Sequence, residues 1–225
     1  MDAAPDTDAI IIGAGPAGLF AAFQLGHFGL QSALIDTLAG AGGQCRALYA
    51  DKPVFDVPGF ARIDAGEFVE RLLIQVEPIT PVFLFNRKAV SIRRDGSRGL
   101  TVTTSGDEEL RSKVVIIAAG GGALRAGVAA PDNFALDAMP VHSWGFPAVD
   151  GAIPVDSATF LTGVPGIFAI GDACDYPGKV RLIVSGCHEA VLMAQAVRKM
   201  LRPGGRAPLY ASTSPTLRRR LGVEE

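Results

Sequence analysis

Three glycines have the spacing of a site for a nucleotide phosphate. Gly13, Gly15 and Gly18 form a G-x-G-x-x-G run between the apolar segment 10–12 and an apolar stretch with helical character. Gly13 permits a tight turn, Gly15 lets a pyrophosphate approach the backbone, and Gly18 lets the helix pack closely on the strand. Asp36 ends the next apolar run about twenty residues later, where an acid can bind a ribose hydroxyl. The pattern predicts a dinucleotide site, and the alternative is a glycine-rich turn that binds nothing.

A second group of polar side chains lies in a loop rich in glycine and proline. Residues 40–60 contain Gln44, Tyr49 and Asp56 among many glycines, prolines and aromatic residues. Glycine and proline at this density fix unusual backbone conformations. A phenol such as Tyr49 can stack on a flat ring and shield one face of it from water. We expect this loop to lie against a flat ligand with polar edges, and the alternative is a plain surface loop.

A third candidate lies at the end of a short apolar strand within residues 166–174. Gly171 and Asp172 end this strand and place a carboxylate where ligands of open α/β sheets bind. A helix follows, predicted to begin with Ser185 as its N-cap and to end before Pro203. The positive end of its dipole would point toward the same ligand.

The cysteines do not form a recognisable redox or metal motif. Cys45, Cys174 and Cys187 are far apart in the chain and make neither C-x-x-C nor a metal-ligand spacing. Free cysteine is usually a small buried apolar residue, and a redox role for Cys45 beside the candidate loop is the alternative. His142 and Trp144 are interpreted as packing residues.

The hydrophobic pattern predicts strands and helices that alternate around these sites. A helix is expected over 17–30, and Asp64 and Glu67 have the form of a capping box for a helix that extends to Val76. From 81 the period changes to two, which indicates strands at 82–85, 89–92, 100–104 and 113–119. The last is almost fully apolar and should lie at the centre of a parallel sheet. The predicted fold is a three-layer α/β domain with a β-meander over 81–112 covering one side.

Length and composition restrict the possible classes of protein. The 225 residues, 48% of them hydrophobic, can form a single domain over 1–225, with its core in 8–125 and 160–215. A net charge of −2 argues against a nucleic-acid partner, and no apolar run is long enough to cross a membrane. The acidic residues 1–8 lack the basic and apolar regions of a secretory signal, so we expect a cytoplasmic protein.

Several sequence runs occur in the order typical of one known family. They are G-A-G-P-A-G, G-G-Q-C-R-A-L-Y-A-D-K, F-D-V-P-G-F, A-I-G-D-A-C-D-Y-P-G-K-V-R-L-I-V-S-G and a final S-T-S. Together they resemble the thioredoxin-reductase-like ferredoxin/flavodoxin–NADP reductases, over residues 8–125 and 145–215. The resemblance implies an FAD-dependent oxidoreductase that binds FAD noncovalently in an extended conformation.

The resemblance also implies a role for each matching residue. Asp36 would hold the adenosine ribose, Val90 the adenine and Asp172 the ribitol. Gln44 and Tyr49 would contact the flavin end. Leu124 stands where the family usually has an aromatic residue, and Thr213 would approach the flavin from the C-terminal tail. The other predicted FAD-binding residues are Gly13, Gly15, Pro16, Ala17, Gly18, Gly43, Asp56, Gly120, Gly171 and Ile183.

The chain departs from the family pattern in two places. The family inserts a complete nicotinamide-binding domain between the strand ending near Gly120 and the Gly171–Asp172 pair. Here the short segment 121–160 stands in its place and contains no second G-x-G-x-x-G. The family also has a histidine before S-T-S that covers the flavin from the partner subunit, where this chain has Ala211. Because the family forms homodimers, a homodimer is expected.

These observations leave three functional hypotheses. In the first, an FAD oxidoreductase exchanges electrons with an external ferredoxin, flavodoxin, separate reductase subunit or small substrate. In the second, NAD(P)H still reduces the flavin through a non-standard site. In the third, the chain is an FAD-binding protein without catalytic turnover. No acid–base pair or nucleophile in the sequence demands a more specific mechanism.

Overall fold

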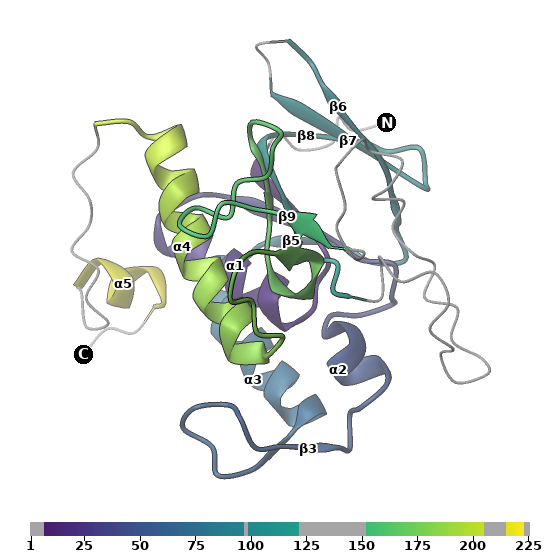
Figure 1. Ribbon diagram of the computed structural model, residues 1–225, viewed down its shortest axis with the longest axis vertical. Helices are drawn as coiled ribbons and strands as arrows, with labels where there is room; N and C mark the ends of the chain where they lie inside the picture. The colour runs from purple at the N-terminus through teal and green to yellow at the C-terminus, as the bar shows by residue number, and fades with distance from the viewer. Residues whose placement is uncertain (1–6, 97–98, 122–151, 205–214, 223–225) are drawn as a thin grey trace.

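A parallel sheet forms the centre of the molecule (Figure 1). The computed structural model describes residues 7–96, 99–121, 152–204 and 215–222. The parallel strands follow the order β5 (Val82–Leu84), β2 (Ser32–Ile35), β1 (Thr7–Ile12), β8 (Glu109–Ile117) and β10 (Ile167–Ala169). As predicted, the apolar strand that ends near residue 119 lies inside the sheet, between β1 and β10.

Strand β8 takes part in two kinds of sheet, and its sequence reflects both. Its first half pairs antiparallel with β7 (Leu100–Thr104) and alternates exposed and buried residues from Glu109 to Lys113. Its second half, Val114–Ile117, is buried throughout and pairs in parallel on both sides. A strand covered on both faces cannot carry polar residues on alternate positions, which explains the change of pattern. Strand β6 (Ala89–Arg94) completes the antiparallel part and projects with β7 from one end of the sheet (Figure 1).

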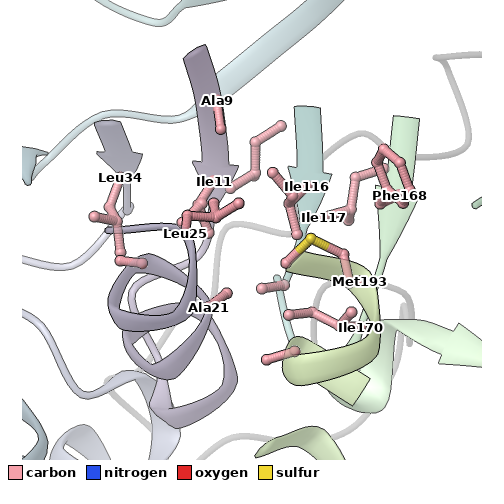
Figure 2. Close-up of a cluster of buried hydrophobic side chains, with 14 of the residues drawn as sticks. Ala9, Ile11, Ala21, Leu25, Leu34, Ile116, Ile117, Phe168, Ile170 and Met193 are labelled. Atoms are coloured by element: carbon pink, nitrogen blue, oxygen red, sulfur yellow. The ribbon is translucent and has the colours of Figure 1, made fainter. Parts of the chain in front are cut away.

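Two long helices lie side by side on one face of the parallel strands. They are α1 (Pro16–His27) and α4 (Ile183–Leu201), and they pack against each other as well as against the sheet. Figure 2 shows Ile11 of β1, Leu34 of β2, Ile116 of β8 and Phe168 of β10 meeting Leu25 of α1 and Met193 of α4. Because α1 is enclosed by β1, α3 and α4, its almost uniformly apolar sequence is buried nearly all round.

The start of helix α3 (Ala65–Val76) differs from the prediction. Asp64 is the N-cap residue, but its side chain makes no capping hydrogen bond and pairs with Arg62, while Glu67 pairs with Arg71. The backbone N–H groups of Ala65 and Gly66 instead donate to the carbonyl oxygens of residues 52 and 50, at 3.0 and 2.9 Å. The predicted capping box is therefore wrong: both carboxylates pair with arginines, and the first two N–H groups of the helix have carbonyl acceptors in a neighbouring segment.

The strand at 82–84 also has a different partner from the one predicted. The β-meander was expected over 81–112, but β5 joins β2 in the parallel sheet, and the antiparallel part consists of β6, β7 and the first half of β8. The period-two pattern is the same for both kinds of pairing and does not distinguish them. None of the described helices is long and apolar enough to cross a membrane.

Shorter elements complete the part of the chain that the structure describes. They are α2 (Gly43–Ala47), β3 (Pro53–Val54), β4 (Ile63–Asp64), η1 (Glu77–Ile79), β9 (Ile153–Pro154), η3 (Gly171–Ala173), β11 (Cys174–Asp175) and α5 (Pro215–Arg220). The segment 40–60, predicted as a loop, thus contains the short helix α2 and the strand β3. His142 and Trp144 lie outside the described residues.

Candidate functional site

The three candidate segments of the sequence meet at one cleft. It lies at the carboxyl ends of β1 and β8, where the N-termini of α1 and α4 also converge. The predicted residues that line it are Gly13, Gly15, Pro16, Ala17, Asp36, Gly43, Gln44, Gly120, Gly171, Asp172 and Ile183. Segments separated by more than 150 residues therefore form one site, as expected for open α/β sheets.

The glycine turn is held too tightly to accept side chains. Gly13 has a φ of +109°, and a Cβ there would lie 2.3 Å from the carbonyl oxygen of Ala118, the residue after the neighbouring strand β8. At Gly18 a Cβ would lie 2.0 Å from the carbonyl oxygen of Gly13. Gly18 does not line the cleft, and its contact with Gly13 is the close helix–strand packing that the sequence predicts.

The start of the second candidate segment packs directly on the glycine turn. The N–H of Gly42 donates to the carbonyl oxygen of Ala14 at 2.8 Å. A Cβ at Gly43 would lie 3.1 Å from the Cα of Gly15, so the two backbones face each other with no side chain between them. This contact leaves backbone and small side chains at the cleft wall, where a ligand can approach closely.

Asp36 joins the glycine turn to the end of β2. Its side chain is only 6% exposed, and its two carboxylate oxygens accept the N–H groups of Ala14 at 2.7 Å and Leu38 at 2.9 Å. Burial raises the pKa of this carboxyl above its ordinary value, although these backbone donors act in the opposite direction. Each carboxylate oxygen has a further acceptor site, and Asp36 lines the cleft, so it can also accept a ligand hydroxyl.

Both helices present their N-termini to the cleft without a side-chain cap. Gly15 is the N-cap of α1 and Leu182 is the N-cap of α4, and neither first turn contains an acidic residue. Helix α4 begins at Ile183 and its N-cap lies three residues before the predicted one, so Ser185 is in the first turn and is not the cap. The uncapped N–H groups and the two dipoles make this part of the cleft suitable for anionic or electron-rich ligand groups.

The cleft has further lining residues that the predicted set did not contain. They are Thr37, Leu38, Cys45, Ala118, Ala119, Gly121, Arg181, Leu182 and Gly186. Ala118 and Ala119 follow the central strand, and Arg181 and Leu182 precede α4. Each lies close to a predicted site residue in the sequence, and this proximity could have identified them.

The remaining predicted residues have other positions. Tyr49, Asp56 and Val90 do not line this cleft, and Tyr49 is 40% exposed with the Lys52 ammonium 4.7 Å from its ring centre. Leu124 and Thr213 lie outside the described residues, as does Ala211. Roles in FAD binding for all of these residues stay predictions.

The cysteines are free thiols in this structure. Burial raises the pKa of Cys45, which lines the cleft, and the nearby Asp172 carboxylate raises it further. Burial and the Glu189 carboxylate raise the pKa of Cys174 to about 12 and that of Cys187 to about 11. Since the thiolate is the reactive form, all three environments disfavour reactivity.

The donor set of the cleft fits FAD. The glycine turn and the N-terminus of α1 offer backbone N–H groups for a pyrophosphate, and Asp36 offers acceptors for ribose hydroxyls. Asp172 offers a carboxylate for a polyhydroxyl chain, and the N-terminus of α4 offers a positive dipole end for an electron-rich ring edge.

Known proteins with similar sequences are oxidoreductases. The family model described as pyridine nucleotide-disulphide oxidoreductase matches residues 7–139. The chain is 31% identical over 335 aligned positions to a ferredoxin–NADP reductase of Mesorhizobium japonicum, covering 96% of this chain and 98% of that protein. It is also 31% identical over 337 positions to a ferredoxin–NADP reductase of Beijerinckia indica, with the same coverage.

The solved structures support the fold. A thioredoxin reductase from Gloeobacter violaceus superposes with a TM-score of 0.72 over 92% of this chain and 99% of that chain, at 15% sequence identity. The alignment with the Mesorhizobium reductase extends over 335 positions, whereas this chain has 225 residues. At least 110 positions of the alignment are therefore gaps in this chain.

Proposed function

This chain belongs to the pyridine nucleotide-disulphide oxidoreductase family and is an FAD-dependent oxidoreductase, and we propose that its flavin exchanges electrons with an external partner. The proposal rests mainly on length. The aligned reductase has at least 110 positions with no counterpart here, and residues 121–170 contain no second G-x-G-x-x-G. We infer that a nicotinamide-binding domain is missing at this point, leaving a single FAD-binding domain.

When bound, FAD supplies the electron-transfer chemistry at its flavin ring. The chain's own residues bind and orient it. The N–H groups at the start of α1 hold the pyrophosphate, and Asp36 holds the adenosine ribose while its other contacts fix the glycine turn. Asp172 holds the ribitol, and the dipole of α4 favours added negative charge on the ring. The apolar side chains of Leu182 and Ile183 also line this part of the cleft.

A ferredoxin is the partner that the relatives' names favour. Both aligned reductases are named for ferredoxin and NADP, and a chain without a nicotinamide domain would retain the ferredoxin half of that exchange. Arg181 is an exposed cation at the cleft and offers a contact for an acidic partner surface. A homodimer and a cytoplasmic location remain predictions.

The proposal is tested by mixing the purified FAD-loaded protein with NADPH or NADH without oxygen while following the visible flavin band. We expect the band to persist with both nucleotides and to bleach with reduced ferredoxin or dithionite. Rapid bleaching by either nucleotide would refute the external-partner proposal and show that a nicotinamide site exists without the second domain. Bleaching by dithionite alone would exclude ferredoxin and leave a small substrate or no turnover.

A further inference from the structure

A fully buried carboxylate lies directly behind the cleft and is not explained by the proposed contacts with FAD. Glu189 of α4 has no exposed side-chain surface. Its Oε2 accepts the N–H of Gly171 at 2.6 Å, and its Oε1 accepts the hydroxyl of Tyr176 at 2.9 Å. The ammonium of Lys179, whose side chain is 3% exposed, forms an ion pair with Oε1. The Cys174 thiol lies 3.6 Å from Oε2.

All of these donors come from one short segment of the chain. Residues 171–179 connect β10 to the approach of α4, and they fold around the Glu189 carboxylate. A carboxylate has about four acceptor sites, and Gly171, Tyr176 and Lys179 occupy three of them. Charge-assisted hydrogen bonds are stronger than neutral ones, especially where water is excluded. Glu189 therefore ties residues 171–179 to the second turn of α4.

The position that Glu189 fixes is part of the cleft wall. Gly171 and Asp172 line the cleft, and Gly171 has a φ of +66°. A Cβ at Gly171 would lie 3.1 Å from the Cβ of Ala17, and a Cβ at Gly186 would lie 3.2 Å from the same atom. Gly171 is thus packed between the first turns of α1 and α4, and a shift of its N–H would displace Asp172 relative to both helix N-termini.

The charge of Glu189 is balanced only while Lys179 stays in place. Both side chains are buried, so each leaves an uncompensated charge if the other is removed. That charge would lie behind Gly171, the residue before Asp172, which is the proposed contact for the ribitol. Because a buried site has a low effective dielectric constant, the uncompensated charge would act strongly on a bound ligand whose own charge changes.

We propose that Glu189 is a positioning residue that holds Gly171 and Asp172 against the N-terminus of α4, and that the Glu189–Lys179 pair sets the affinity and reduction potential of the bound FAD. The proposal rests on the proposed use of this cleft for FAD. Its two parts are separable, because geometry determines the affinity and net charge determines the sign of any change in potential.

The test uses the FAD-loaded full chain with the variants Glu189→Gln, Lys179→Met and their combination. The midpoint potential of the flavin is measured by spectroelectrochemical titration, and the Kd for FAD by fluorescence titration of the apo-protein. Because reduction adds negative charge, Glu189→Gln should raise the potential and Lys179→Met should lower it. The double variant, which carries neither charge, should return close to the starting potential. We expect Glu189→Gln to raise the Kd by at least about tenfold, since it loses charge-assisted bonds.

Glu67→Gln is the matched control. It makes the same chemical change in an exposed ion pair on α3 and should leave the potential unchanged and the Kd within about twofold. If Glu189 had a purely structural role, the potentials of Glu189→Gln and Lys179→Met would shift in the same direction or would both stay unchanged. Either result would overturn the proposal. If Glu189→Gln does not fold, Lys179→Met and Tyr176→Phe replace it. The proposal is supported if Lys179→Met lowers the potential and Tyr176→Phe leaves it unchanged, and it is refuted if the two variants have equal potentials.

Failure of the proposed function gives a different result. Dithionite and dyes reduce the flavin whatever its physiological partner, so the potentials do not depend on the donor. If the unmodified chain takes up no FAD, the assignment of the cleft fails altogether. If it binds FAD and the variants match it in potential and Kd, only the role of Glu189 is refuted.

Discussion

Replacing Gly18 by alanine tests whether the close packing of α1 on the glycine turn is what makes the cleft. The new Cβ would lie 2.0 Å from the carbonyl oxygen of Gly13, whereas ordinary contact is 3.4–4 Å, so the backbone of the turn must move. Overpacking costs about 1–3 kcal/mol, and more when backbone must shift, while alanine gains about 1 kcal/mol in helix propensity. We expect a net loss of about 2 kcal/mol in the free energy of unfolding, or about 4–8 °C in Tm for a domain of this size.

Gly26→Ala on the same helix is the matched control. A Cβ there would also lie 2.0 Å from a neighbouring atom, but that atom belongs to the side chain of Ile79. Holding the Ile79 side chain away from a favoured rotamer costs about 0.5–1.5 kcal/mol, which the helix propensity of alanine largely offsets. Thermal unfolding of the apo-proteins and FAD titration should therefore show a lowered Tm and weakened FAD binding for Gly18→Ala only. Equal shifts in Tm, or full FAD affinity in Gly18→Ala, would refute the argument from the backbone contact.

Four further predictions concern the side chains of Asp36, Cys187 and Tyr49. Asp36→Ala should raise the Kd for FAD at least about tenfold in fluorescence titration, because the Ala14 and Leu38 N–H groups lose a buried acceptor; an unchanged Kd would exclude Asp36 from the site. Because the folded-state pKa of Asp36 is raised above 3.8, its contribution to the stability of the apo-protein falls as pH rises through that pKa. In a titration of FAD at decreasing pH, the affinity should fall as Asp36 becomes protonated, at a pH where exposed aspartates are still ionised. At pH 8 Cys187, with a pKa of about 11, should react with Ellman's reagent about 100-fold more slowly than an ordinary thiol of pKa 9.0, and labelling at the ordinary rate in the folded protein would contradict the raised pKa. Tyr49→Ala should change the visible flavin spectrum if this ring stacks on the flavin, and an identical spectrum would remove Tyr49 from the stack.

Local sequence was sufficient for the features that depend on neighbours in the chain. The glycine turn, the apolar strand segments 10–12 and 114–117 and the position of Gly171 shortly after β10 were all predicted, because backbone freedom and hydrophobic periodicity act over a few residues. The resemblance added the family and its FAD, which the family match confirms.

One signal in the sequence was available but not used. Glu189 falls on the face of α4 that also carries Ala190, Met193 and Val197, all of them buried. A charged residue on an otherwise apolar helix face predicts a buried partner. Its identity could not be inferred, because Lys179 and the N–H of Gly171 reach it only after β10 and α4 have packed.

The amino-acid sequence was thus sufficient to predict the long helices, the main strands, the glycine turn and the carboxylates at strand ends. Contacts between distant segments determine that β5 pairs with β2, that the carbonyl oxygens of residues 50 and 52 accept the first two N–H groups of α3, and that Gly43 packs on Gly15. Because a period-two pattern or a free N–H has many possible partners, the choice among them depends on contacts between segments far apart in the chain.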